Sequence, residues 1–385
     1  MQRTASTKRR AGPRLLLALL ATAVALVLCE VAVRLFVPVE APQLGQVSYA
    51  NGDGTQITRE DAFARGLIVP VEKTKTPRDR LMVAPAQKFF LCYTDAKKLR
   101  RAWFDDQGRV RIRINRFGLR ERDEITQEKP VGQKRIVCVG DSFTFGWGIP
   151  EEDGWVRRLE DELRKAGSDV RTVNCGWAGT VCVDEYWWGL QHRFHVFGPD
   201  AVIVTICLND LIPSSGLNLI DPQRTTGIRI LDLLLGAVGR SPLDLDPSRD
   251  WVQELLDLPR QQAIDSRLAG PDKPFEAMWS QGVPQASLRA MKSWCDERKI
   301  PLMVILWPFL QGLGEGRFYP FRKLHELVAA DCKAAAIPYL DVMPALAGTR
   351  DEDLWVTPAD PHPNPLAQSL ALPKIFQFVT THCRF

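Results

Sequence analysis

The sequence lacks several patterns that mark metal sites and repeat proteins. No C-x-x-C pair occurs among its nine cysteines, whose spacings match no familiar zinc site. There is no internal repeat and no low-complexity tract, and no acidic residue precedes Glu30. No metal is therefore expected, and the missing acids leave the N-terminus strongly basic.

What the chain does contain is a globular composition with one basic cluster. Of its 385 residues, 45% are hydrophobic and 25% are charged, which excludes a disordered or fibrous protein. The net charge of +4 is mild, and much of the excess comes from Arg3, Lys8, Arg9, Arg10 and Arg14. Because the excess is clustered, no nucleic-acid partner is expected, and the cluster points to a membrane.

An apolar segment follows these charges directly. Residues 15–29 carry no charge and one polar side chain, that of Thr22. As a helix continued through Val33, the segment reaches about 28 Å, close to the roughly 30 Å hydrocarbon core of a bilayer. We expect a basic cytoplasmic tail at residues 1–14 and an uncleaved transmembrane signal-anchor at residues 15–36. A cleaved signal peptide is the alternative, but no clear Ala-x-Ala site follows.

Export would place the remaining cysteines in a compartment where disulfides can form. Cys138 and Cys207 fall inside apolar strand patterns and fit best as small core residues. One or two disulfides among the other cysteines of the exported part are an open possibility, because pairing cannot be read from sequence.

From residue 135 onwards, strands and helices alternate, as in a parallel sheet that is covered on both faces. Strands are expected at residues 135–140, 170–175, 201–208, 301–308 and 338–342. Helices are expected at residues 154–166, 184–197, 286–299, 321–336 and after Pro365. The sequence therefore predicts an α/β fold, a flavodoxin-like three-layer α/β/α arrangement with a parallel sheet.

Two regions stand outside this alternation. Residues 37–129 form a linker and N-terminal accessory region ahead of the main domain at residues 130–385, and the alternating stretch "RVRIRINRFGLRER" within them predicts a half-exposed strand. An insertion at about residues 213–284 is too long for a plain connection. Near the carboxyl edge of the sheet, it suits a lid or a substrate-shaping element.

Polar residues and a glycine follow successive predicted strands, where open α/β folds place reactive groups. Ser142 follows the first strand in "GDSF", Gly179 the second in "NCGWAG", and Asn209 the third in "CLND". His362 opens the loop into the last helix in "DPHPNP". Acyl transfer by serine needs a nucleophile, a histidine base and donors aimed at the developing oxyanion, and this set offers one candidate for each part.

These blocks, in this order, resemble the SGNH/GDSL hydrolase family of esterases, lipases and carbohydrate deacetylases. The resemblance runs from about residue 135 to the C-terminus, interrupted by the insertion. It implies that Ser142 is the nucleophile and His362 the base. It also implies an oxyanion hole made by the backbone N–H groups of Ser142 and Gly179 and the side chain of Asn209.

The sequence departs from the family pattern at two positions. Cys207 stands where the family usually has a glycine two residues before the asparagine. Ala359 stands three residues before His362, where the family's triad acid normally lies, and Asp360 stands two before instead. We expect a shifted loop to bring the Asp360 carboxylate to the imidazole; the alternative is a dyad oriented by a backbone carbonyl.

The chain is therefore expected to be a membrane-anchored, exported serine esterase that acts on an acylated small molecule or polysaccharide and needs no cofactor. Its catalytic domain would be extracytoplasmic, and periplasmic in a Gram-negative cell. An O-acetyltransferase with the same residues is one alternative. A catalytically weak envelope or polysaccharide-binding protein is another, and the missing acid at position 359 is its best support.

Several neighbouring side chains have simpler explanations or supporting roles. Trp147 and Trp177 lie inside the motif loops and are expected to line the substrate pocket. Asp141 is expected to shape the nucleophile turn without moving a proton. His192 and His195 have a spacing that could bind metal on a helix, but without a carboxylate motif, surface or packing roles are expected.

Overall fold

The structure is a computed structural model that describes residues 11–36, 47–51, 56–57, 66, 68–71, 80–93, 101–121, 123–178, 181–211, 230–231, 279 and 282–383. The chain divides into two compact units, Met1–Gln43 with Asn218–Ser248, and Leu44–Leu217 with Arg249–Phe385. The insertion expected at about residues 213–284 lies almost wholly outside the described residues.

The described residues of the smaller unit are those of the helix α1 (Ala11–Phe36) and residues 230–231. Its stretch Leu15–Phe36 is long and apolar enough to cross a membrane, and none of it is buried in the protein. Towards its end, Glu30 and Arg34 form an ion pair one turn apart, and the backbone N–H of Ile230 donates to Glu30 at 2.9 Å. A signal sequence would have the same length and composition, so the helix alone does not fix its role.

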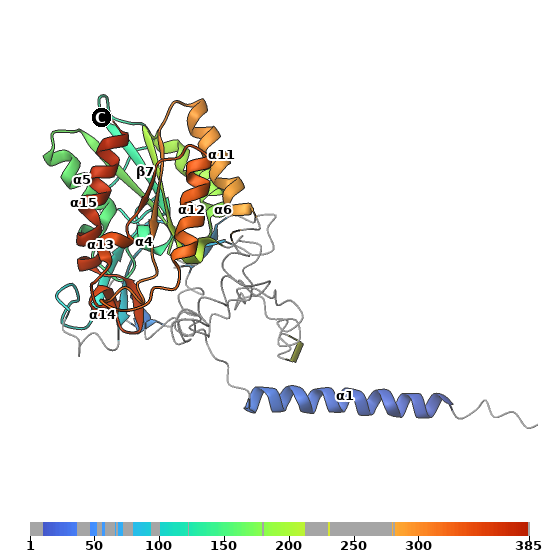
Figure 1. Ribbon diagram of the computed structural model, residues 1–385. Helices are drawn as coiled ribbons and strands as arrows, with labels where there is room; N and C mark the ends of the chain where they lie inside the picture. Colours follow the sequence, from blue (N-terminus) through green and yellow to red (C-terminus); the bar gives the residue numbers. More distant parts are fainter. Residues whose placement is uncertain are drawn as a thin grey trace, which may run out of the picture. The chain divides into compact units, whose positions relative to one another are not determined.

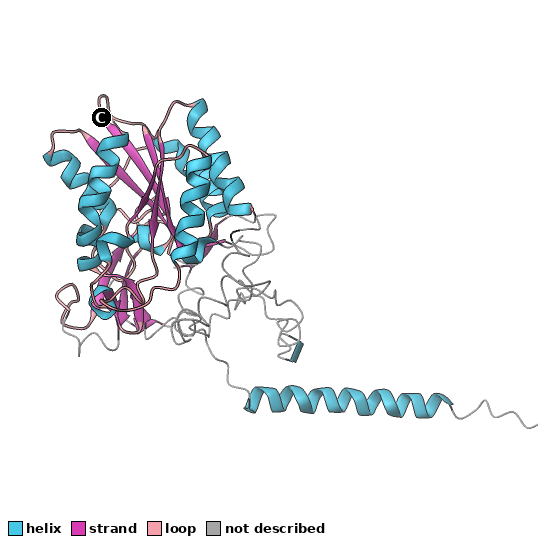
Figure 2. Ribbon diagram, viewed as in Figure 1, coloured by secondary structure: helices cyan, strands magenta, loops and turns pink. Residues whose placement is uncertain are grey.

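The larger unit is built on a five-stranded parallel sheet (Figures 1 and 2). Its strands are β7 (Lys134–Gly140), β8 (Val170–Gly176), β9 (Ala201–Cys207), β10 (Leu302–Trp307) and β11 (Tyr339–Asp341). They lie in the order β8-β7-β9-β10-β11, which is the flavodoxin-like order. β8, β9 and β10 are buried along their whole length, as expected for apolar strands covered on both faces. The predicted α/β fold is confirmed.

Two groups of helices cover the two faces of this sheet (Figure 1). α5 (Trp155–Lys165) and α15 (Pro365–His382) pack together on one face. α6 (Val183–Gly189), α11 (Val283–Glu297) and α12 (Arg322–Ala334) lie on the other. Each of these helices follows a strand, so the connections carry the chain back across a face of the sheet.

The helix predicted at residues 184–197 is not continuous. α6 ends at Gly189, a π-helical turn covers Leu190–Phe194, and a 3₁₀ turn covers His195–Phe197. The Phe194 ring folds back onto Gly189, where a Cβ would lie only 2.5 Å from the ring. Glycine at this position allows the close contact.

The N-terminal accessory region forms an antiparallel sheet of its own, in the order β2-β1-β5-β6. Its strands are β1 (Val47–Asn51), β2 (Gln56–Ile57), β5 (Lys88–Tyr93) and β6 (Arg109–Arg113), and a separate hairpin joins β3 (Ile68–Val71) to β4 (Arg80–Val83). β6 alternates buried and exposed positions, which confirms the half-exposed strand. One apolar cluster joins β5 and β6 to Phe145, Ile149 and Val356, so this sheet shares a core with the segments that carry the site.

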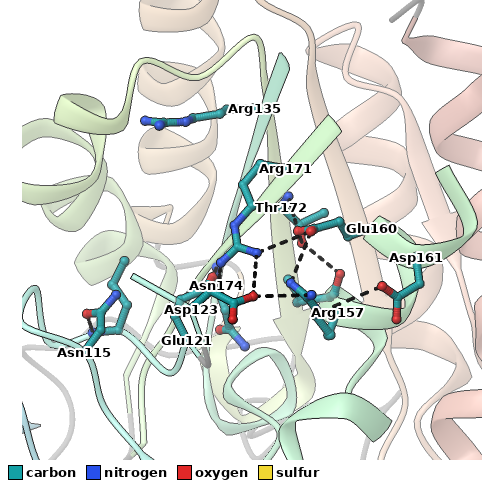
Figure 3. A network of polar contacts seen from close by, with 12 residues as sticks. Asn115, Glu121, Asp123, Arg135, Arg157, Glu160, Asp161, Arg171, Thr172 and Asn174 are labelled. Carbon is teal, nitrogen blue, oxygen red and sulfur yellow. Dashed lines mark hydrogen bonds and ion pairs between the residues drawn. The ribbon is translucent and has the colours of Figure 1, made fainter. Parts of the chain in front are cut away.

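The free edge of the parallel sheet is closed by buried carboxylates. β8 is an edge strand, and the N–H groups of Thr172 and Asn174 face away from the sheet. Glu160 accepts from Thr172 at 2.9 Å, and Glu121, from the accessory region, accepts from Asn174 at 2.7 Å. Arg171 lies between the two carboxylates and pairs with both (Figure 3). Unpaired edge groups invite association, so this network both satisfies and shields the strand.

All nine cysteines are free in the structure, and every one except Cys29 is buried. None of the disulfides left open by the sequence is therefore formed. Burial raises the pKa of Cys138 and Cys207 well above the ordinary value for a thiol, which keeps them protonated and unreactive.

Candidate active site

Ser142 begins the one-turn helix α4 (Ser142–Phe145) directly after β7. Asp141 caps this turn, because its carboxylate accepts from the N–H of Phe143 at 2.9 Å. Gly140 makes the sharp exit possible, since a Cβ there would lie 2.1 Å from Thr144 Oγ1. The sequence thus folds so that the serine hydroxyl is presented at the carboxyl edge of the sheet.

His362 and Asp360 are brought to Ser142 by a hairpin near the C-terminus. β12 (Trp355–Thr357) pairs antiparallel with β13 (Asp360–Pro363). Residues two apart on a strand share one face, so the side chains of Asp360 and His362 lie together despite the unusual spacing. His362 Nε2 lies 2.9 Å from Ser142 Oγ, and His362 Nδ1 is hydrogen-bonded to Asp360 Oδ1. The strand conformation replaces the expected shifted loop.

The charges at this hairpin support each other. Burial lowers the pKa of His362, but the charge of Asp360 and the hydrogen bond to it raise that pKa by more, so it lies above its usual value. Burial raises the pKa of Asp360, but His362 and the donated hydrogen bonds bring it below its usual value. The pair therefore favours an ionised carboxylate and a basic imidazole.

Asp141 lies at the same edge but in a different environment. Its Oδ2 is 3.4 Å from Ser142 Oγ, and burial raises the pKa of its carboxyl to about 6. Its shorter hydrogen bond goes to the backbone of α4, which fits the turn-shaping role predicted for it.

The predicted oxyanion donors are only partly described. Gly179 lies outside the described residues. Asn209 lies in the 3₁₀ turn Leu208–Leu211 directly after β9. β7 and β9 flank the point where the strand order reverses, so Ser142 and Asn209 end the two strands at which open α/β sheets bind ligands. Within the described chain, Asn209 Oδ1 is buried and has no hydrogen-bond partner.

The two tryptophans predicted to line the pocket lie in different surroundings. The Trp147 ring is partly buried and lies 6.2 Å from the His362 ring. Trp177 is buried and packs against Phe194 and Trp188. Trp147 is therefore better placed to meet a substrate. His192 is exposed and lies against Trp188, and no metal-ligand cluster occurs in the described part of the chain.

Two accessory-region side chains that no sequence motif predicted reach the site. Tyr93, at the end of β5, donates its hydroxyl to Asp360 Oδ2 at 2.8 Å. Arg120 is fully buried and donates to the carbonyl groups of Phe145, Gly146 and Ile149, in the loop that follows Ser142. Burial lowers the pKa of Arg120 to about 10, so it remains charged at neutral pH. Neither contact is local in sequence, so no motif could reveal it.

A parallel α/β sheet that carries a serine, a histidine and a carboxylate in hydrogen-bonded order has the architecture of a serine hydrolase. The model of the GDSL-like lipase/acylhydrolase family matches residues 138–370 of this sequence. The chain belongs to this family, and its class of chemistry is the hydrolysis of esters.

Several solved structures are similar to this chain at low identity. TesA shares 14% identity over 65% of this chain and 100% of its own, with a TM-score of 0.39. The acetylxylan esterase Axe2 from Geobacillus stearothermophilus shares 13% over 64% and 94%, with a TM-score of 0.39. The psychrotrophic esterase EstA from Pseudoalteromonas sp. shares 13% over 64% and 97%, with a TM-score of 0.38. No curated protein matches the chain in sequence.

Proposed function

We propose that the chain hydrolyses a carboxylic ester through an acyl-enzyme formed on Ser142. The observation that carries this proposal is the continuous chain from Ser142 Oγ through His362 to Asp360. His362 Nε2 takes the hydroxyl proton as Ser142 attacks the ester carbonyl, and it returns that proton to the leaving alcohol. Water then repeats the cycle, and Asp360 orients the imidazole and stabilises its charged form.

The oxyanion of the tetrahedral intermediate would be held at the carboxyl edge of the sheet. We assign the donors to the N–H groups of Ser142 and Gly179 and to the amide of Asn209. The position of Asn209 after β9 and the place of Ser142 at the start of α4 support this assignment. Removing one such donor typically costs a factor of about 10²–10³ in kcat.

The proposed substrate is an acetyl or short acyl ester, carried by a small molecule or a polysaccharide outside the cytoplasm. The aromatic ring of Trp147 beside His362 supports a site that receives a compact group against an apolar wall. Trp147→Ala should raise KM for short-chain esters more than it lowers kcat. Transfer of the acyl group to a sugar hydroxyl by the same residues is the alternative reaction.

The proposed location is the outer side of a membrane, with α1 as the anchor. The exposed apolar stretch Leu15–Phe36 and the basic residues before it support this orientation. Membranes from cells that make the full chain should retain it after an alkaline wash, and protease added to intact spheroplasts should degrade the large unit. Release of the chain by the alkaline wash would refute the role of α1 as a membrane anchor.

The experiment that tests the reaction is hydrolysis of p-nitrophenyl acetate by the full chain in detergent. Wild type should turn over, and Ser142→Ala should fall by at least about 10³-fold, to the level of the buffer. Ser168→Ala is the matched control, because Ser168 precedes β8 at the opposite edge of the sheet. Equal rates for wild type and Ser142→Ala would refute simple ester hydrolysis at this serine.

A further inference from the structure

We propose that Tyr93 is a positioning residue for Asp360, so that the accessory sheet completes the active site with a fourth side chain. The inference rests on the proposed function and deepens it. The two residues are separated by 267 positions in the chain, yet the Tyr93 hydroxyl lies 2.8 Å from Asp360 Oδ2. The accessory region would then contribute to catalysis through Tyr93.

The division of hydrogen bonds at Asp360 shows what Tyr93 contributes. Oδ1 is used by His362, which bonds to it through both Nδ1 and its backbone N–H. Within the described residues, Tyr93 makes the only hydrogen bond to Oδ2. With both oxygens held, the carboxylate cannot rotate about its terminal bond without losing a partner, so its plane stays directed at the imidazole.

Asp360 needs a hydrogen-bond partner for Oδ2 because it lies on a short hairpin and its side chain is buried. It stands on a hairpin of two short strands, and β13 spans only Asp360–Pro363. Its side chain is 5% exposed, so solvent cannot satisfy the second oxygen. A buried carboxylate without that bond would be costly, and a phenol hydroxyl satisfies it without introducing a second charge.

The surroundings hold the Tyr93 ring in place. The ring lies 5.1 Å from that of Phe104 and belongs to the apolar cluster that contains Val356 and Ile149. Gly148 leaves the space for the hydroxyl, since a Cβ there would lie 2.6 Å from it and 2.7 Å from a methyl group of Val356. The ring of Tyr93 is therefore held by packing, and its hydroxyl donates to Asp360.

The test is a set of four full-length variants in detergent, Tyr93→Phe, Asp360→Ala, the double variant and Tyr339→Phe. Tyr93→Phe removes one oxygen and keeps the ring, and Tyr339→Phe is the matched control on β11, where the hydroxyl makes a 3.5 Å contact to a backbone carbonyl. With p-nitrophenyl acetate, we expect Tyr93→Phe to lower kcat about tenfold with little change in KM. In the Asp360→Ala background, the same change should have no further effect, because its target is absent.

A spectroscopic arm separates this inference from the proposed reaction. The Nδ1 proton of His362 should give a downfield NMR signal in histidine-labelled wild type that is lost in Asp360→Ala. We expect this signal to shift in Tyr93→Phe and to stay in place in Tyr339→Phe, whether or not the chain hydrolyses the probe ester. An unmoved signal in Tyr93→Phe, or an equal loss of kcat in both Asp360 backgrounds, would overturn the positioning role. If the wild type does not hydrolyse the ester but the His362 signal shifts in Tyr93→Phe, the proposed ester hydrolysis is refuted and the positioning role of Tyr93 is retained.

Discussion

Two of the contacts between the accessory region and the α/β domain differ in chemistry. At the catalytic edge, the neutral hydroxyl of Tyr93 donates to Oδ2 of Asp360. The other oxygen of Asp360, Oδ1, is hydrogen-bonded to His362. At the edge of β8, the carboxyl of Glu121, whose pKa burial raises to about 8, pairs with Arg171 and accepts from the N–H of Asn174 (Figure 3). One contact concerns the orientation of a group that reacts, and the other closes the end of a sheet.

The difference teaches that burial and hydrogen bonding alone do not mark function. Glu121 and Asp360 are equally buried carboxyl groups, but Glu121 contacts Arg171 and the backbone N–H of Asn174, and burial raises its pKa to about 8. Asp360 gives its charge to an imidazole, which in turn meets a hydroxyl. We therefore expect changes at the first to move stability and changes at the second to move rate.

The largest expected effect is that of Asp360→Ala on catalysis. We expect kcat to fall about 10³-fold, because the imidazole loses the group that orients it and stabilises its charge. The unfolding midpoint of the variant, followed by circular dichroism, should change much less. If kcat stays within a few fold of wild type, His362 works as a dyad with Ser142.

The pH profile of the same variant sharpens this prediction. His362 acts as a base only when neutral, so activity should rise with pH through its raised pKa, above the usual 6.5. Without Asp360, burial lowers that pKa and only Asp141 still raises it, so the acid limb of kcat/KM should move to lower pH. A limb that moves upward or stays in place would contradict the electrostatic account.

The next effect is on folding. Glu121→Ala removes one carboxyl partner of the buried Arg171, which keeps Glu160, and it removes the acceptor of the Asn174 N–H. The free energy of unfolding should therefore fall by about 3 kcal/mol. Denaturant unfolding measures this, and kcat per folded molecule should stay unchanged. Glu162→Ala, which breaks the surface pair with Lys165, is the matched control and should have no measurable effect. A rate effect of Glu121→Ala would break the contrast between the two contacts.

A smaller effect is expected at Gly148, beside the hydroxyl of Tyr93. Gly148 has a φ of +77°, and a Cβ there would press on the Tyr93 hydroxyl and on Val356. Gly148→Ala should cost about 2 kcal/mol of stability through strain and overpacking, and kcat should fall several-fold as Tyr93 is displaced. Thermal unfolding and ester hydrolysis on the same sample check both. An unchanged kcat in a destabilised Gly148→Ala variant would contradict the role of Tyr93 in catalysis.

Local patterns predicted the sheet and part of the site, because their signals lie within a few residues. The apolar run before Ser142 gives β7, and the Gly-Asp-Ser turn after it gives the exposed hydroxyl. The π-helical turn after α6 was not predicted, because the helical pattern continues through residues 190–197.

Long-range contacts were beyond the same reasoning. The spacing of Asp360 predicted that its carboxylate would reach the imidazole, but the strand that brings it there depends on pairing with β12. The approach of Tyr93 and Arg120 depends on how a second sheet packs against the first, and single sequences carry no local signal for such packing. The oxyanion role of Gly179 stays a prediction.

The most direct test of the account is covalent labelling of the full chain by a fluorophosphonate, followed by peptide mass spectrometry. The probe reacts with a serine whose hydroxyl is activated by a base. The account predicts one adduct, on the peptide that contains Ser142, formed by wild type and by Ser168→Ala and lost in Ser142→Ala. A folded wild-type chain that gives no adduct, or one on another residue, would contradict the claim that Ser142, His362 and Asp360 form the working site.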